Sequence, residues 1–126
     1  MNGYLLIAAI LAIGIGGAHS WLGERYLITR LLRRNDLPHL FGSDQFTQQT
    51  IRYAWHLTTA AWWGLALMLL MVSGFFPDIH QVDGVLLIIS MTFAASAVLS
   101  LIFTKGRHIS WVVFVAIAVL CIIAVL

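Results

Sequence analysis

Charged residues are scarce in this chain of 126 residues. Seven Lys and Arg and five Asp and Glu make up 10% of the sequence, whereas a soluble domain carries about 25%. So few charges cannot cover the surface of a soluble globule, which excludes a soluble enzyme. The hydrophobic share of 61% excludes a disordered chain, because so much apolar surface cannot stay in water. We therefore expect an integral membrane protein.

Cysteine is almost absent as well. The single Cys121 excludes an intramolecular disulfide and a metal site built from several thiolates. The sequence also contains no HExxH or CxxC motif and no glycine-rich phosphate loop. No catalytic residue can be assigned from spacing, and whether the protein is an enzyme stays open.

The chain contains four long apolar runs. A membrane-crossing helix needs about 20 apolar residues, and the runs cover residues 4–22, 53–72, 85–103 and 109–126. Helices are expected because an open four-stranded sheet would leave unpaired backbone groups in lipid. The sequence predicts an all-α fold, a four-helix transmembrane bundle forming one membrane domain over residues 1–126, with residues 23–52 as a cytoplasmic loop.

The basic residues lie on alternate connections between these runs. Five of the seven lie within residues 23–52 and two, Lys105 and Arg107, within residues 104–108, while residues 73–84 contain no Lys or Arg. By the positive-inside rule, the two basic connections face the cytoplasm and both termini face the other side. The arginines are expected to attract anionic lipid. Membrane lipids are thus the expected partners, a homo-oligomer or a membrane partner protein is left open, and no nucleic acid is expected.

Two local patterns concern the ends and the packing of the helices. Residues 24–34 are amphipathic and predict an extension of the first helix, and Ser43 or Asp44 is expected to cap the second.

Small residues recur at four-residue spacing, which allows close helix packing in lipid. One stripe is Ala8, Ala12, Gly16 and Ser20, and the other is Thr92, Ser96, Ser100 and Thr104. Of the tryptophans, Trp21, Trp55 and Trp111 are expected in an interfacial aromatic belt, and Trp62 and Trp63 deeper.

Two histidines lie inside the predicted spans. His19 and His56 are each three residues from the basic end of their span, which places both about 5 Å below the boundary. A histidine in the membrane is costly unless it is paired, so both are functional candidates. Because consecutive helices are usually neighbours, the two imidazoles are expected to face each other, with His108 near the same level.

Three interpretations of these histidines follow. A transition-metal ion would take N and O ligands from four side chains, which are His19, His56, His108 and Glu24. Haem b would take His19 and His56 as axial ligands, with Arg25 or Arg52 at the propionates. The alternatives are a structural or regulatory subunit in which the histidines clamp helices together, and a proton-coupled or small-molecule carrier. We take metal or haem binding as the specific prediction.

Two stretches carry a resemblance to known proteins. GAHSWLGERYL at residues 17–27 and IRYAWHLTTAAWW at residues 51–63 together resemble a group of small, uncharacterised bacterial inner-membrane proteins. The likeness covers the first two predicted helices and the segment that joins them. It implies the membrane topology and a bacterial origin, and it brings no activity.

Overall fold

The structure is a computed structural model that describes residues 1–34 and 36–126, and this part of the chain is helical, without strands. The first helix is continuous but changes its winding, from α1 through the π-helical η1 to α2, with bounds Gly3–Leu22, Gly23–Ile28 and Thr29–Leu31. A short 3₁₀ turn, η2 (Leu40–Gly42), precedes the other three helices, which are α3 (Asp44–Val72), α4 (Gln81–Thr104) and α5 (Ser110–Ile123). The predicted all-α class and the four helices are confirmed for the described residues.

Three of the four helices are long and apolar enough to cross a membrane. They are Gly3–Leu31 with 29 residues, Asp44–Val72 with 29 and Gln81–Thr104 with 24. The fourth predicted span, residues 109–126, forms a shorter apolar helix of 14 residues, α5. At 1.5 Å per residue it is about 21 Å long, against a hydrocarbon thickness of about 30 Å.

Much of the predicted cytoplasmic loop, residues 23–52, is helical, as the expected extension of the first helix and the expected cap at Ser43 or Asp44 require. The first helix continues to Leu31, and α3 already begins at Asp44. Ser43 is the N-cap of α3, because its hydroxyl accepts a hydrogen bond from the backbone N–H of Phe46 at 3.3 Å. Hydropathy marks where a helix leaves the apolar layer, but polar residues continue a helix into water when its backbone bonds are kept. The connection that remains is therefore short, residues 32–43.

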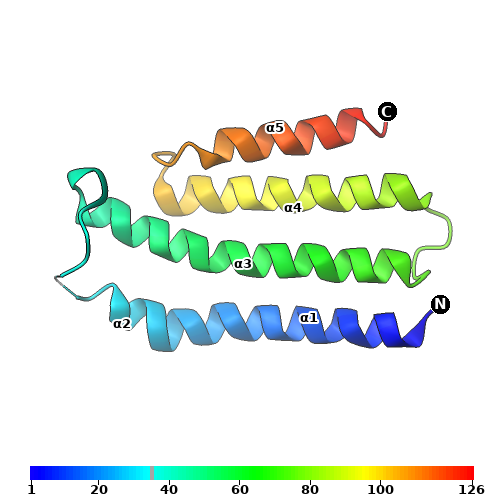
Figure 1. Cartoon of the computed structure of the whole chain (residues 1–126), viewed down its shortest axis with the longest axis horizontal. Helices are drawn as coiled ribbons and strands as arrows, with labels where there is room; N and C mark the ends of the chain where they lie inside the picture. Colours follow the sequence, from blue (N-terminus) through cyan, green and yellow to red (C-terminus); the bar gives the residue numbers. More distant parts are fainter. Residues whose placement is uncertain (35) are drawn as a thin grey trace.

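The four helices lie side by side in one row, in the order α1, α3, α4, α5 (Figure 1). Each packs against its neighbour in the chain, and within the described residues α1 makes no close backbone contact with α4 or α5. The predicted bundle is thus an open layer rather than a ring of helices around a common core. Lipid tails are as apolar as leucine, so both faces of such a layer can remain uncovered in a membrane.

The two termini lie at the same end of the helices, and the connection between α2 and α3 lies at the opposite end (Figure 1). All seven Lys and Arg belong to the helix ends and connections at that opposite end, which we call the basic end. The alternation of charge along the sequence therefore becomes a separation of charge between the two ends of the fold.

Glycines of the first helix let α3 approach closely. A Cβ atom at Gly16 would lie 2.7 Å from Nε1 of Trp63, and one at Gly23 would collide with the ring of Trp55. Both indole N–H groups donate to backbone carbonyls of α1, each at 3.1 Å. The packing role of Gly16 is confirmed. Trp55 lies in this helix contact, because its ring occupies the space that Gly23 leaves free.

The polar stripe of α4 is also used for packing. Ser100 and Thr104 are fully buried, and Ser100 Oγ lies 2.8 Å from Ser110 Oγ at the start of α5. On the side toward α3, a Cβ atom at Gly64 would collide with the side chain of Thr92. The stripe therefore holds α4 between its two neighbours, as its spacing predicts.

Candidate functional site

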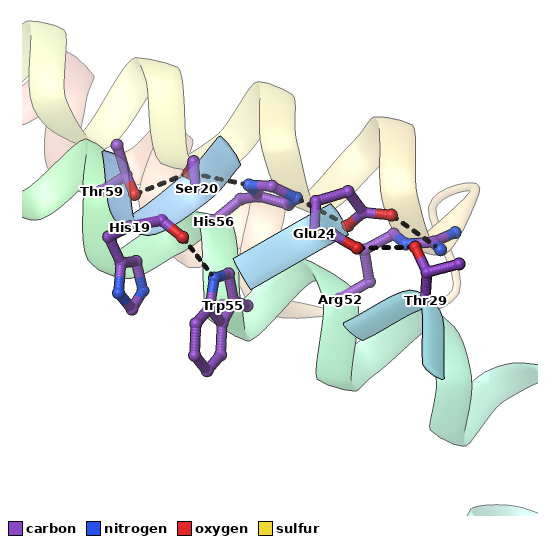
Figure 2. A network of polar contacts seen from close by, with 8 residues as sticks. All are labelled: His19, Ser20, Glu24, Thr29, Arg52, Trp55, His56 and Thr59. Atoms are coloured by element: carbon purple, nitrogen blue, oxygen red, sulfur yellow. Dashed lines mark hydrogen bonds and ion pairs between the residues drawn. The ribbon is translucent and has the colours of Figure 1, made fainter. Parts of the chain in front are cut away.

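A hydrogen-bonded chain of side chains joins the first helix to α3 near the basic end (Figure 2). At its centre is His56 of α3, whose Nδ1 lies 2.9 Å from Ser20 Oγ and whose Nε2 lies 3.2 Å from Glu24 Oε2. Ser20 and Glu24 are four residues apart and therefore lie on one face of the first helix. One imidazole can thus bridge both of them. We call Ser20, His56 and Glu24 the polar chain.

The polar chain continues at both ends. Ser20 Oγ lies 2.7 Å from Thr59 Oγ1, which also donates to the carbonyl of Gly16 at 3.2 Å. At the other end, Glu24 Oε1 accepts from Arg52 Nη2 at 2.9 Å (Figure 2). The side chains of Glu24 and Arg52 are 35% and 37% exposed, and that of His56 is 17% exposed. Hydrogen bonds therefore run without interruption from a half-exposed ion pair into the helix contact.

The backbone winds more widely where Glu24 lies. The π-helical segment η1 covers Gly23–Ile28, and the Thr29 hydroxyl donates to the carbonyl of Glu24 at 2.6 Å (Figure 2). A π-helical turn inserts an extra residue into a helix and is often found at functional sites. Here it begins at Gly23, directly after the last turn of α1, and Glu24 is its second residue.

His19 does not join the polar chain. Its imidazole points away from that of His56 (Figure 2) and stacks on the ring of Trp55, with centroids 4.3 Å apart and planes at 6°. Its Nε2 is buried and has no hydrogen-bond partner within the described residues. Neighbouring residues of an α-helix are about 100° apart around the axis. Because Ser20 faces His56, the preceding residue His19 turns to the other side, and the expected face-to-face pair does not form.

The remaining candidate residues are also separate from the polar chain. His108 Nδ1 lies 2.8 Å from Ser110 Oγ, and its ring stacks on that of Phe46 at the start of α3. The guanidinium of Arg25 lies 5.8 Å from the ring centre of Trp21. Both are thus engaged by other side chains at the basic end.

The structure brings together only part of the predicted ligand sets. Of the four metal ligands, His56 and Glu24 are in contact, and of the two propionate arginines, Arg52 joins them. Within residues 1–34 and 36–126, no group of three or more His, Cys, Asp or Glu side chains is arranged to hold a metal ion.

An apolar groove of about 600 Å³ adjoins the polar chain. Its floor is α3 from His56 to Leu67, one wall is α4 from Met91 to Phe103, and α1 contributes Ser20. The ring of Phe103 stacks on His56 with centroids 5.2 Å apart. Along α3 the groove is about 16 Å long at 1.5 Å per residue. Sequence reasoning gave no indication of this groove, because it exists only where α1 and α4 flank α3.

The polar chain suits binding and proton exchange better than ester hydrolysis. It has the hydroxyl, imidazole and carboxylate composition of a hydrolase triad. Ser20, however, lies inside α1, where backbone N–H groups are already bonded within the helix. No pair of backbone donors is therefore available beside Ser20 to stabilise an oxyanion.

Ser20 is the site residue that sequence reasoning missed as a functional candidate. It was assigned only to the small-residue stripe. The available signal was its four-residue distance from Glu24, which places a hydroxyl and a carboxylate on the helix face that the stripe turns toward a neighbour.

No protein-family model, curated protein or solved structure matches this chain. Its function is therefore argued from the geometry of the polar chain and the groove.

Proposed function

We propose that the chain is a multi-pass membrane protein that binds an amphipathic, lipid-like molecule in the groove, with the polar group of that molecule at the polar chain. One observation carries the proposal, namely that Ser20, His56 and Thr59 gather at one end of an otherwise apolar groove. The other polar lining residue, Thr92, already donates its hydroxyl to the carbonyl of Ile88 at 2.8 Å. A pocket with an apolar wall and a few convergent polar groups is the usual form of a small-molecule site.

The length of the groove supports a ligand of this kind. Its extent of about 16 Å is close to half of a hydrocarbon core of about 30 Å. A molecule with its polar group near His56 would thus extend its apolar part to the middle of the bilayer. Hydroxyl and imidazole groups both donate and accept hydrogen bonds, so a ligand hydroxyl, ester or carboxyl group would find partners there.

Photolabelling tests the proposal. A fatty acid with a photoactivatable diazirine in its chain should label α3 and α4 along the groove, as mapped by mass spectrometry of the purified protein. The variant Ala95→Phe fills the groove and should lower this labelling. The matched control is Ala94→Phe, because Ala94 is exposed on the same helix and does not line the groove. Equal labelling of the two variants, or labelling spread evenly over all lipid-facing helices, would contradict binding in the groove.

We further propose a bacterial inner membrane as the location, with the basic end in the cytoplasm. Support comes from the gathering of all seven basic residues at one end of the helices, which the positive-inside rule assigns to the cytoplasmic side.

Metal or haem binding is a second candidate, favoured by the buried and unpartnered Nε2 of His19 within the described residues. An imidazole nitrogen in this state can serve as a ligand. The test is a visible spectrum and elemental analysis of protein purified without chelators after haem-replete expression. If both histidines are ligands, His19→Ala and His56→Ala should each remove the same bound species. A colourless, metal-free wild type would rule this candidate out.

A further inference from the structure

A second cavity lies beside the groove, toward the basic end. It has a volume of about 270 Å³ and is lined by residues of α3 and α4, which are Gln45, Gln48, Gln49, Arg52, Ile102 and Phe103. We call it the polar cleft. Phe103 lines both cavities, and Arg52 connects the polar cleft to Glu24 of the polar chain. Toward the basic end, the apolar groove is therefore followed by the polar chain and then by the polar cleft.

Two buried atoms of residues that line the polar cleft have no partner. Gln49 Oε1 and Arg52 Nε are buried and make no hydrogen bond within the described part of the chain. Arg52 uses Nη2 for Glu24, so Nε is left for another group. Buried polar atoms in folded proteins are nearly always paired. Arg52 Nε can donate to an oxygen of a bound molecule, whereas Gln49 Oε1 is an acceptor and pairs with a donor such as a headgroup hydroxyl.

The charges at the cleft favour an anion. Among the described residues, its lining includes the cation Arg52, which is already paired with the carboxylate of Glu24 outside the lining. Lys105 and Arg107 follow directly after the end of α4, close in sequence to Phe103. Amide groups and a guanidinium together offer several N–H donors, and the guanidinium geometry matches the oxygens of a phosphate group.

The depth of the cleft corresponds to the headgroup layer of a membrane. Gln49 lies four residues outside the start of the apolar run at residue 53, which is about 6 Å along a helix. The headgroup region adds roughly 5–8 Å to each side of the hydrocarbon core. A lipid with its tail in the groove would thus hold its phosphate at the level of the polar cleft.

We infer that the polar cleft binds the phosphate headgroup of an anionic phospholipid whose acyl chain lies in the groove. The inference rests on the proposed function and adds the ligand class to it. Free phosphate is a poorer occupant, because it makes no use of the apolar groove that continues from the cleft.

Native mass spectrometry tests the inference directly. The full chain is incubated with vesicles of equal amounts of phosphatidylglycerol and phosphatidylcholine with the same acyl chains, and the lipids retained after extraction are compared. The wild type should retain mainly phosphatidylglycerol. Arg52→Gln should lower this preference about tenfold, the effect of one charge-assisted hydrogen bond. Arg33→Gln is the matched control, because Arg33 is an exposed cation of the same end that does not line the cleft.

A second variant guards against a folding effect. Gln49→Leu leaves the ion pair of Arg52 and Glu24 intact and should also lower the preference for phosphatidylglycerol. Equal retention of both lipids by the wild type would overturn the inference. The same holds if Arg33→Gln lowers the preference for phosphatidylglycerol as much as Arg52→Gln does, or if inorganic phosphate displaces the lipid. If photolabelling of the groove still depends on Ala95 in that case, the proposed function stands without the headgroup site. Loss of both signals would overturn the two together.

Discussion

His56 has hydrogen-bond partners for both ring nitrogens on the first helix, and this makes it the main polar link between α1 and α3. Bonds of this kind join helices in lipid, where no hydrophobic drive brings them together. The same side chain lines the apolar groove. A ligand that takes over one of its bonds would therefore compete with a helix contact, so binding at the groove and packing of α1 against α3 are coupled.

Ser20→Ala is expected to weaken this link. The variant loses the contacts of the hydroxyl with His56 and Thr59, and at about 0.6 kcal/mol for each membrane hydrogen bond the free energy of unfolding should fall by about 1 kcal/mol. Thr58→Ala is the control, since its hydroxyl bonds within α3 to the carbonyl of Ala54. The measurement is unfolding in mixed micelles with increasing denaturing detergent. An equal loss in both variants would show that the interhelical bonds contribute little.

Asp36 and Arg34 allow a prediction about pH outside the membrane-spanning segments. Arg34 donates two hydrogen bonds to the carboxylate, at 2.6 and 2.8 Å, and these lower the pKa of Asp36 below its ordinary value of 3.8. The stabilisation is present above that ordinary value and is lost as the pH falls through the lowered pKa. Arg34→Gln should raise the pKa of Asp36 toward 3.8, as followed by NMR titration of its carboxyl carbon, whereas Arg33→Gln should leave it unchanged.

At the scale of the elements, two helices of 29 residues carry the site. Each is about 44 Å long, longer than a hydrocarbon core of about 30 Å. Their ends therefore reach into the headgroup region as continuous helices. Glu24 and Arg52 lie on these projecting turns, so the ion pair between them is held by rigid backbone rather than by a loop.

Gly23→Ala tests how closely these two helices must approach. The added Cβ would collide with the ring of Trp55, and overpacking of this kind costs about 1–3 kcal/mol of unfolding free energy. Gly17→Ala is the matched control, because a Cβ there meets no atom within 4 Å and alanine favours a helix. The same detergent titration compares the two. Equal stability would mean that the Trp55 ring shifts without cost.

At the scale of the whole molecule, the single row of helices explains why so few large side chains are buried. Fully buried side chains are mostly small or polar, such as Ser100 and Thr104. Large apolar side chains cover the outside instead, among them Ile10, Leu65 and Ile102, each more than half exposed. The row leaves α3 flanked but uncovered between α1 and α4, and the groove forms there.

Thiol labelling tests the orientation of the row. On a Cys121→Ala background, His80→Cys and Asp36→Cys place one thiol at each end of the fold. With an impermeant reagent added to intact bacteria, position 80 should label and position 36 should stay protected, because the basic end is expected in the cytoplasm. The reverse pattern would contradict the orientation and would place the polar cleft on the outer side of the membrane.

The all-helical class, the four helices and the charge separation could be predicted from the sequence alone. Each depends on local quantities, namely the length of an apolar run and the position of Arg and Lys relative to it. The packing role of Gly16 was predictable for the same reason, since a four-residue spacing already defines one helix face. The start of α3 was predictable too, because Ser43 is a typical capping residue, and so was the continuation of the first helix beyond its apolar run, which an amphipathic pattern marks.

Only the tertiary structure decided which polar side chains meet. The contacts of Gly16 with Trp63 and of Gly23 with Trp55 set the rotation of the first helix against α3. Because one residue corresponds to about 100° of rotation, that packing turns Ser20 rather than His19 toward His56. It likewise pairs Glu24 with a residue of α3 rather than with its neighbour in sequence. The groove depends on three helices at once and the polar cleft on two. The rotation of each helix is decided by the shape of its neighbours, which no single segment of sequence contains.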